Sequence, residues 1–421
     1  MDSQKGVDAM FGHSCGTERD VGPFRWKDPL ERRVGSGPVS PAVLLAREVV
    51  EQALEQGASD IHLEPETDGM VIRCRLDGVL QKLRTVPKNL QDPLVSRFKI
   101  LSGMDIGEKR LPQDGRFQEA WQDRQVDVRV SSLPTLHGES LVLRLLDQEN
   151  VALDLSRLGF SRHNRARLDR CLQKPHGLFL VTGPTGSGKS TTLYGALAAL
   201  DRDHQKIITV EDPVEYQLPG IRQVAVRPKI GLTFSRCLRS ILRQDPDCIL
   251  IGEIRDGETA AMAIQAALTG HRVLSTLHTN TAAGAVNRIL DMGVEPYLAA
   301  SALQGVAGQL LVRRLCSHCK KAYTVQEQDW EWSYLGLQEP RTLYRAQGCP
   351  RCRHTGYGGR LPLQEVLLVE GSVRQGILDG WHEEALEKEA RKTGFRSLRD
   401  DGREKVLAGE TSAEELLRVL G

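Results

Sequence analysis

Between residues 155 and 310, short apolar runs alternate with longer segments of helical periodicity. Each apolar run is nearly continuous, which is typical of a strand that is buried on both faces of a sheet. Strands that alternate with helices along a chain form parallel sheets. The pattern therefore predicts an α/β domain over 155–310, with strands at 178–182, 206–210, 248–251 and 272–275.

Between residues 41 and 150 the pattern mixes one helix with shorter alternating runs. Apolar residues recur at helical spacing from 41 to 56, and Gly57 stands where a glycine commonly ends a helix. Asp77-Gly78 between two apolar-rich runs favours a two-residue hairpin. We expect a compact α+β domain over 41–150, with strands near 59–63, 71–76, 79–83, 126–131 and 141–146.

The segments outside these two predicted domains have other patterns. Residues 1–38 carry glycine, proline and mixed charge without periodicity, so we expect a poorly ordered tail over 1–40. The segment 311–365 holds two cysteine pairs and is expected to form a separate metal-binding module. Residues 366–421 have a helical pattern, with helices expected at 383–392 and 414–420.

Composition excludes several classes of protein. A chain of 421 residues is too long for one core, and a net charge of +1 gives no general basicity for nucleic-acid binding. No apolar run reaches the length of a membrane span, and the N-terminus has no signal-peptide core. We therefore expect a cytoplasmic protein that reaches a membrane only through protein partners and binds no nucleic acid directly.

A glycine-rich loop fits the phosphate-binding pattern G-x-x-x-x-G-K-[ST] in full. It lies between an expected strand and an expected helix, which is the setting that lets backbone N–H groups and a helix N-terminus face phosphate. Lys189 is expected to reach the β- and γ-phosphates of ATP, and the Ser190 hydroxyl to bind Mg²⁺. The predicted nucleotide-binding residues are Gly183, Pro184, Thr185, Gly186, Ser187, Gly188, Lys189, Ser190 and Thr191.

Carboxylates follow two of the other strands, at the edge where α/β sheets bind ligands. Glu253 is the candidate that orients the attacking water of an ATPase, although Gly252 stands where an aspartate is usual. Mg²⁺ coordination is then water-mediated or shared. Glu211 and Asp212 after the second strand either support the metal and water or form a plain solvated turn.

Histidines and arginines complete the candidate site. His271 and His278 flank the fourth strand, where they either sense phosphate or serve the structure alone. Arginines on rigid elements can stabilise transition-state charge across a subunit boundary, and solvated surface arginines are the alternative. The candidates are Arg129, Arg144, Arg239 and Arg243.

Two C-x-x-C pairs about thirty residues apart form a four-cysteine zinc pattern: Cys316, Cys319, Cys349 and Cys352. Disulfides or degenerate knuckles are the alternative. The five scattered cysteines lie in apolar or helical settings and are expected to be buried free thiols of a reducing compartment, namely Cys15, Cys74, Cys171, Cys237 and Cys248.

These motifs together resemble those of the ATPases that assemble type II secretion pseudopili and type IV pili. The resemblance runs from about residue 41 to 421, close to nine-tenths of the chain. The matching stretches are ASDIHLEP (58–65), RLPQDGR (110–116), LVTGPTGSGKSTTLY (180–194), TVEDPVEY (209–216), LRSILRQDPDCILIGEIRDGETA (238–260), TGHRVLSTLHTN (269–280) and GCPRCRHTGYGGR (348–360).

The resemblance implies a PAS-like N-terminal domain joined to a RecA-like P-loop ATPase domain, and a homo-hexamer. It implies catalytic roles for Glu253, Lys189, Glu211 and His278, and contacts from Arg129, Arg144, Arg239 and Arg243 to the nucleotide. The glycine before the glutamate is itself a family feature. The four-cysteine module is similar to that of the assembly members, which retraction motors lack.

The resemblance therefore implies a cytoplasmic ATPase motor that assembles pseudopilus subunits for type II secretion, and that docks on inner-membrane platform proteins. Several sequence segments resemble this branch more closely than the alternative branch, which comprises the ATPases of pilus extension and of DNA-uptake pili. A RecA-like nucleic-acid motor is a further alternative, but the sequence shows neither a basic stripe nor stacking aromatics. A ring component that binds nucleotide without hydrolysis is another.

Overall fold

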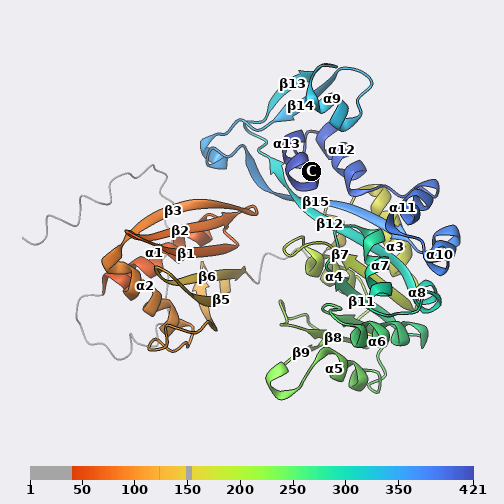
Figure 1. Ribbon diagram of the computed structural model, residues 1–421, viewed down its shortest axis with the longest axis horizontal. Helices are drawn as coiled ribbons and strands as arrows, with labels where there is room; N and C mark the ends of the chain where they lie inside the picture. Colours follow the sequence, from red (N-terminus) through yellow and green to blue (C-terminus); the bar gives the residue numbers. More distant parts are fainter. Residues whose placement is uncertain (1–39, 123, 148–153) are drawn as a thin grey trace, which may run out of the picture. The chain divides into compact units, whose positions relative to one another are not determined.

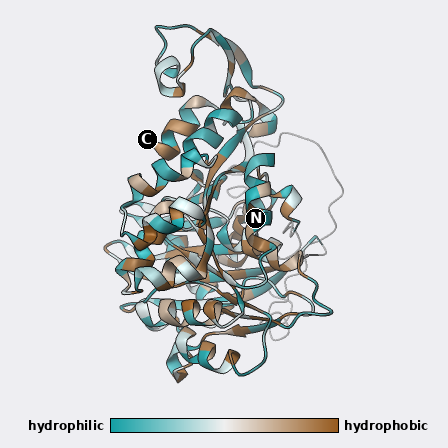
Figure 2. Cartoon of the chain, turned by 90° about the vertical axis from the view of Figure 1, so that its right-hand side faces the viewer, coloured by the Kyte–Doolittle hydropathy of each residue, from teal (hydrophilic) through white to brown (hydrophobic). Residues whose placement is uncertain are grey.

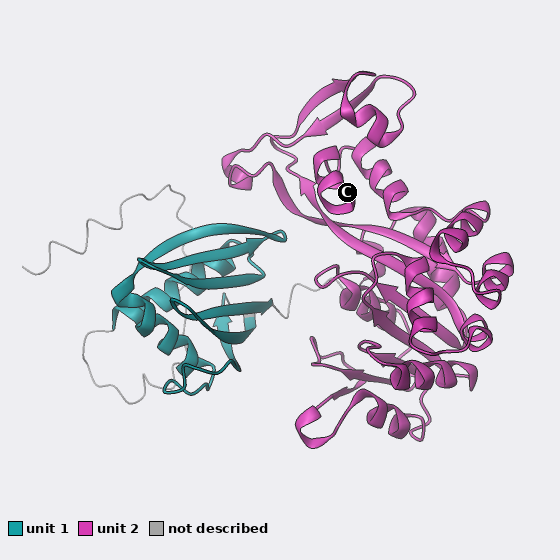
Figure 3. Cartoon of the chain, viewed as in Figure 1, with its two compact units in different colours: residues 1–149 teal, residues 150–421 magenta. Residues whose placement is uncertain are grey.

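The computed structural model describes residues 40–122, 124–147 and 154–421. It divides into two compact units, Met1–Glu149 and Asn150–Gly421, which Figure 3 colours separately. The predicted tail over 1–40 falls almost entirely outside the described residues, as does Cys15. No helix of the described residues has both the length and the apolarity that a membrane span requires.

The first unit is an antiparallel sheet covered by two helices (Figure 1). Its six strands lie in the order β3-β2-β1-β6-β5-β4. Their bounds are β1 Asp60–Glu66, β2 Gly69–Leu76, β3 Val79–Pro87, β4 Gln113–Trp121, β5 Arg124–Thr135 and β6 Gly138–Asp147, and the helices are α1 Pro41–Glu55 and α2 Lys88–Leu101. The expected α+β character is confirmed, whereas α2 and β4 were not predicted.

The core of this unit forms where helices and sheet meet. The apolar face of α1, including Ala46, Val49 and Val50, packs with alternate strand residues such as Ile61 and Leu143. In β2 and β5 buried apolar residues alternate with mostly polar, more exposed ones, as expected for an antiparallel sheet with one covered face. Helix α1 ends one residue earlier than predicted.

The second unit is built on a seven-stranded sheet in the order β15-β12-β7-β11-β10-β8-β9. The strands are β7 Gly177–Thr182, β8 Ile207–Glu211, β9 Arg222–Ala225, β10 Cys248–Ile251, β11 Arg272–Leu277, β12 Leu303–Leu315 and β15 Tyr357–Leu368. All neighbouring pairs are parallel except β12 with β15. The four predicted strands are confirmed, with ends that differ by no more than two residues.

Helices cover both faces of this sheet, and Figure 2 shows that they carry hydrophobic and hydrophilic residues together. Leu178 and Leu180 of β7 belong to one core cluster and Phe179 and Val181 to another, so the strand is buried on both sides. The helices are α3 Arg162–Leu172, α4 Lys189–Ala198, α5 Phe234–Ile241, α6 Gly257–Leu268, α7 Ala282–Asp291, α8 Pro296–Ala302, α10 Gly371–Leu378, α11 Glu383–Lys392, α12 Leu398–Leu407 and α13 Ala413–Leu420.

The cysteine segment lies between two strands of the main sheet. It contains the hairpin β13 Lys321–Val325 and β14 Arg341–Arg345, the short helix α9 Trp330–Leu335 and a 3-10 turn at Pro350–Cys352. The limits predicted at 310 and 365 both fall inside strands, because β12 and β15 belong to the seven-stranded sheet and pair with each other, with Gly305 opposite Leu368.

A buried carboxyl on β15 ties two helices to this sheet. Glu365 is 3% exposed, and its two oxygens accept hydrogen bonds from the backbone N–H groups of Ala282 (2.6 Å) and Leu398 (3.0 Å). These residues begin α7 and α12. Burial raises the pKa of Glu365 to about 7, while the two N–H donors oppose this rise.

This pKa predicts a pH dependence of stability. Between pH 4.5 and 7 the folded chain retains a proton on Glu365 that the unfolded chain has released, so the free energy of unfolding should fall as pH rises through this window. The fall should be on the order of 3 kcal/mol, and it should be absent in Glu365→Gln. Denaturant unfolding of both proteins across this range measures it; equal slopes would contradict the prediction.

Candidate nucleotide-binding site and cysteine cluster

The carboxyl ends of four parallel strands meet at one edge of the sheet. Strand β7 ends at Thr182, β8 at Glu211, β10 at Ile251 and β11 at Leu277, and the registers align these ends. Because parallel strands all point the same way, the loops that follow them gather at this edge. The glycine-rich loop 183–188, here called the phosphate loop, lies on this edge together with Asp212, Glu253 and His278, and Glu211 is the last residue of β8.

The phosphate loop joins β7 to α4. Gly186 and Gly188 have positive φ angles of 79° and 88°, a left-handed backbone that glycine adopts without steric cost, and Gly188 is the N-cap of α4. The loop therefore leads directly into the N-terminus of α4, where unpaired N–H groups and the helix dipole favour the binding of an anion. Ser190 is exposed in the first turn, as a ligand of Mg²⁺ must be.

Lys189 is buried and folds back over the loop. Its ammonium group donates hydrogen bonds to the carbonyl oxygens of Gly183 (2.8 Å) and Pro184 (3.0 Å). Burial lowers the pKa of Lys189 to about 8, and the charge of Glu253 partly opposes this. A phosphate would offer the ammonium group a stronger acceptor than two carbonyl groups, and it would raise this pKa.

Glu253 lies at the centre of a polar cluster. Its carboxylate oxygen Oε2 is 3.2 Å from Nε2 of His278, which follows β11. Its other oxygen is ion-paired with Arg255, whose guanidinium also lies 3.7 Å from a carboxylate oxygen of Asp212. The structure thus brings together Glu253 and His278 as the sequence predicted, and it adds Arg255, which the sequence analysis did not single out.

Close packing around Gly252 disfavours a side chain at the position before Glu253. A Cβ atom at this position would lie 3.3 Å from the Cα of Glu211 and 3.3 Å from the carbonyl oxygen of Val210. The backbone N–H of Gly252 also donates to Val210 at 2.7 Å. Glycine therefore lets the ends of β8 and β10 approach closely, which brings Glu211 and Glu253 to neighbouring positions on this edge.

Glu211 is buried at the end of β8. Its carboxylate accepts hydrogen bonds from the hydroxyl groups of Tyr194 and Thr209 and from the Gln223 amide at 3.2 Å. Burial and the neighbouring carboxylate raise the pKa of Tyr194. Because these donors occupy both of its oxygens, Glu211 links α4 to β8 in this structure, and the alternative of a plain solvated turn is wrong for this residue.

The two histidines differ in position. His278 follows β11 on the edge that carries the phosphate loop, and Thr279 beside it is hydrogen-bonded through its backbone N–H to the Thr182 hydroxyl at 2.9 Å. His271 precedes β11 and so lies at the opposite edge, where its Nδ1 is 3.0 Å from the Ala266 carbonyl oxygen. The hypothesis that His271 contacts phosphate is therefore wrong, since β11 separates it from the loop.

Arg239 and Arg243 lie on and just after α5. Arg239 is ion-paired with Glu258, and Arg243 donates to the Arg239 carbonyl oxygen at 2.7 Å. Both side chains are exposed. Within the described residues, no hydrogen bond or ion pair joins them to the phosphate loop, so their contact with nucleotide stays a prediction.

Arg129 and Arg144 belong to the first unit, where β5 and β6 place them directly opposite each other. Arg144 donates to Asp60 on β1 at 3.0 Å. Directly opposed residues of an antiparallel pair face the same side of the sheet. These two arginines therefore form one cationic position on the polar face, and their role towards nucleotide also stays a prediction.

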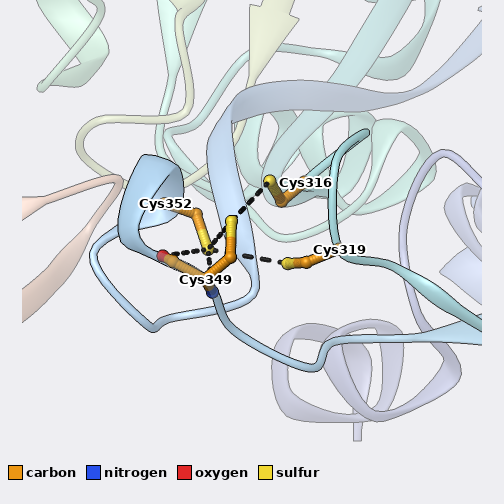
Figure 4. Close-up of side chains that lie close together, drawn as sticks. All are labelled: Cys316, Cys319, Cys349 and Cys352. Atoms are coloured by element: carbon orange, nitrogen blue, oxygen red, sulfur yellow. Dashed lines mark hydrogen bonds between the residues drawn. The ribbon is translucent and has the colours of Figure 1, made fainter.

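The four predicted zinc ligands converge. Figure 4 shows the side chains of Cys316, Cys319, Cys349 and Cys352 pointing toward one another, and their sulfur atoms all lie within 4.8 Å. Three of the Sγ–Sγ distances are 3.7–4.0 Å, which agrees with the roughly 3.8 Å between thiolates around tetrahedral zinc. These four thiols fit a zinc ion.

Backbone donors favour a thiolate at Cys352, whereas burial raises the pKa of Cys319 to about 12. The N–H groups of Cys349 and Gly356 lie 3.1 and 3.2 Å from the Cys352 sulfur, and despite burial they lower its pKa to about 6. The described cysteines outside the cluster are buried and free, as predicted: Cys74, Cys171, Cys237 and Cys248.

Comparison with known proteins places the chain. The sequence model of the family described as type II/IV secretion system protein matches residues 34–418. The chain belongs to this family. The type II secretion system ATPase E of Vibrio cholerae serotype O1 is 50% identical over 380 residues, which are 90% of this chain and 75% of that protein. Type II secretion system protein E of Dickeya dadantii is 50% identical over 382 residues, or 90% of this chain and 76% of that protein.

Two solved structures confirm the predicted fold class. The Legionella pneumophila ATPase DotB has a TM-score of 0.64 and 21% identity, over 91% of this chain and 97% of that one. The pilus retraction motor PilT with bound ADP has a TM-score of 0.54 and 24% identity, over 90% of this chain and 100% of that one. At identities of 21% and 24%, the similarity to these two structures supports the fold of this chain alone.

The cysteine cluster gives a prediction about stability. Cys316→Ser should reduce bound zinc from about one per chain and lower the melting temperature by on the order of 5 °C, because the metal cross-links the segments on either side of the β13–β14 hairpin. Elemental analysis and thermal unfolding measure both quantities. Serine at the buried, scattered Cys237 is the control and should retain the zinc. Full zinc content in Cys316→Ser would contradict the assignment.

Proposed function

We propose that this protein is the ATP-hydrolysing motor of a type II secretion system. One observation carries the proposal: Glu253 lies 3.2 Å from His278 on the same sheet edge as the phosphate loop. A carboxylate held beside a phosphate-binding loop is what an enzyme needs to direct water at a γ-phosphate. The half-identical relatives that are named type II secretion ATPase E or protein E support the branch.

Each residue of the edge then has a task. The loop N–H groups and Lys189 bind the β- and γ-phosphates, and Glu253 accepts a hydrogen bond from the attacking water and orients it. Bound Mg²⁺ would neutralise developing charge, and the exposed Ser190 hydroxyl is the side chain that would hold it. His278 orients the Glu253 carboxylate.

Two sets of contacts, the hydrogen bonds of Lys189 and the ion pair of Glu253, must change for this to happen. Lys189 has to exchange the carbonyl oxygens of Gly183 and Pro184 for phosphate, and Glu253 has to release Arg255 to receive water. Arg255 is then free to contact the transferred phosphoryl group or to strengthen its pairing with Asp212.

We propose further that the protein acts as a homo-hexamer in the cytoplasm and docks on inner-membrane platform proteins to assemble pseudopilus subunits. The resemblance of its motifs and the names of its relatives support this. Zinc in the cysteine cluster serves structure in this proposal, because four thiolates leave no open coordination position for a substrate.

The experiment that tests the proposal is the isosteric change Glu253→Gln. It removes the carboxylate that accepts from water, so steady-state ATP turnover should fall at least ~100-fold while ATP affinity stays within about threefold. Phosphate release and ATP binding by the purified protein measure the two quantities. Glu384→Gln, at an exposed position of helix α11, is the matched control and should retain turnover. Near-normal hydrolysis by Glu253→Gln would reject the assignment.

A further inference from the structure

Strand β12 brings a glutamine against the phosphate loop. Gly308 of β12 pairs with Thr182, the last residue of β7, so the next residue, Gln309, lies level with the start of the loop. Gln309 is 4% exposed. A primary amide that is buried to this degree needs partners for both of its ends.

Both partners of Gln309 belong to the phosphate-binding element. Its Nε2 donates to the carbonyl oxygen of Ser187 at 2.6 Å, and its Oε1 accepts from the Thr192 hydroxyl at 2.7 Å. The Ser187 carbonyl can only accept, which fixes the orientation of the amide. One side chain thus connects the loop to the first turn of α4.

Two glycines of the loop make room for the same residue. A Cβ atom on Gly183 would lie 2.2 Å from the backbone carbonyl oxygen of Gln309, and one on Gly188 would lie 2.7 Å from its side-chain Nε2. Both distances are well below van der Waals contact. The loop is therefore packed against Gln309 at its beginning and at its end, and the absent side chains at these glycines are what permits it.

The loop carbonyl groups show why this matters. Lys189 binds the carbonyl oxygens of Gly183 and Pro184, whereas Gln309 binds that of Ser187. When Lys189 turns to a phosphate, the bond from Gln309 to Ser187 persists, because Gln309 approaches from the neighbouring strand. A carbonyl group that is held there is kept from turning toward the phosphate oxygens, which it would repel.

We propose that Gln309 is a positioning residue for the nucleotide: it fixes the phosphate loop in its binding conformation without touching the substrate. The inference rests on the proposed function, since it concerns the same nucleotide. Gln309 belongs to none of the sequence motifs of the site, which are the phosphate loop, the acidic residues after the strands and the histidine segment.

The chain supplies a matched control for the test. Gln364 of β15 pairs directly with Gln309 across the antiparallel ladder and is 1% exposed. Within the described part of the chain its side-chain amide makes no hydrogen bond. Gln364→Met therefore makes the same chemical change at the facing position of the same sheet, without removing a contact to the loop.

The experiment compares Gln309→Met, Gln309→Asn and Gln364→Met with the wild type. Titration with the fluorescent analogue mant-ADP and Mg²⁺ gives the affinity, and ATP turnover gives KM and kcat. Both Gln309 variants should bind mant-ADP roughly tenfold more weakly and raise KM for ATP by a similar factor, with kcat at saturation within about twofold. Gln364→Met should bind as the wild type does. Circular dichroism establishes that each variant is folded, and Gln309→Asn retains an amide if Gln309→Met does not fold.

The outcomes separate the two claims. Folded Gln309 variants with wild-type affinity, or with a loss equal to that of Gln364→Met, would overturn this inference and leave the proposed function intact. An equal loss of kcat with an unchanged KM would also overturn it, because a positioning role in binding acts on affinity. A wild type that binds no mant-ADP would overturn the proposed function and this inference with it.

Discussion

The parallel pairing of β7, β11, β10 and β8 is the constraint on which the candidate site depends. It brings the ends of four strands that are distant in the sequence to one edge, and the phosphate loop, Glu211, Glu253 and His278 follow from it. Successive residues of β7 are buried in the cores on the two faces of the sheet, which holds the strand in register. The position at which the following loop begins is thereby fixed. The chemistry of the edge is thus a consequence of sheet packing.

Strand β12 extends this constraint beyond the nucleotide. It lies beside β7, carries Gln309 against the phosphate loop, and leads directly into Cys316 of the cysteine cluster. Arg313 on the same strand is paired with the buried carboxylate of Glu415 at 2.7 Å, which attaches α13. One strand therefore joins the phosphate loop, the predicted zinc site and the C-terminal helix α13.

Much of this could be predicted because the signals are local. The glycine loop, the apolar strands and the cysteine spacing each lie within a short window, and acids after strands point to a known edge. Arg255 and Gln309 had no such signal: an arginine beside an acid is usually solvated, and Gln309 acquires its partners only through the pairing of β12 with β7. The module limits at 310 and 365 missed the sheet strands for the same reason, since β12 and β15 are defined by their pairing with each other. His271 was misplaced because only its closeness to β11 was considered: a residue that precedes a parallel strand lies at the edge opposite the phosphate loop.

The measurement that tests this account most directly is a structure of the protein with Mg²⁺ and a non-hydrolysable ATP analogue. The account predicts phosphate oxygens on the loop N–H groups, the Lys189 ammonium group moved from the carbonyl oxygens of Gly183 and Pro184 onto phosphate, Glu253 released from Arg255, and the bond from Gln309 to Ser187 unchanged. An analogue bound away from the loop, or Lys189 and Glu253 still in their present pairs beside a bound triphosphate, would contradict it.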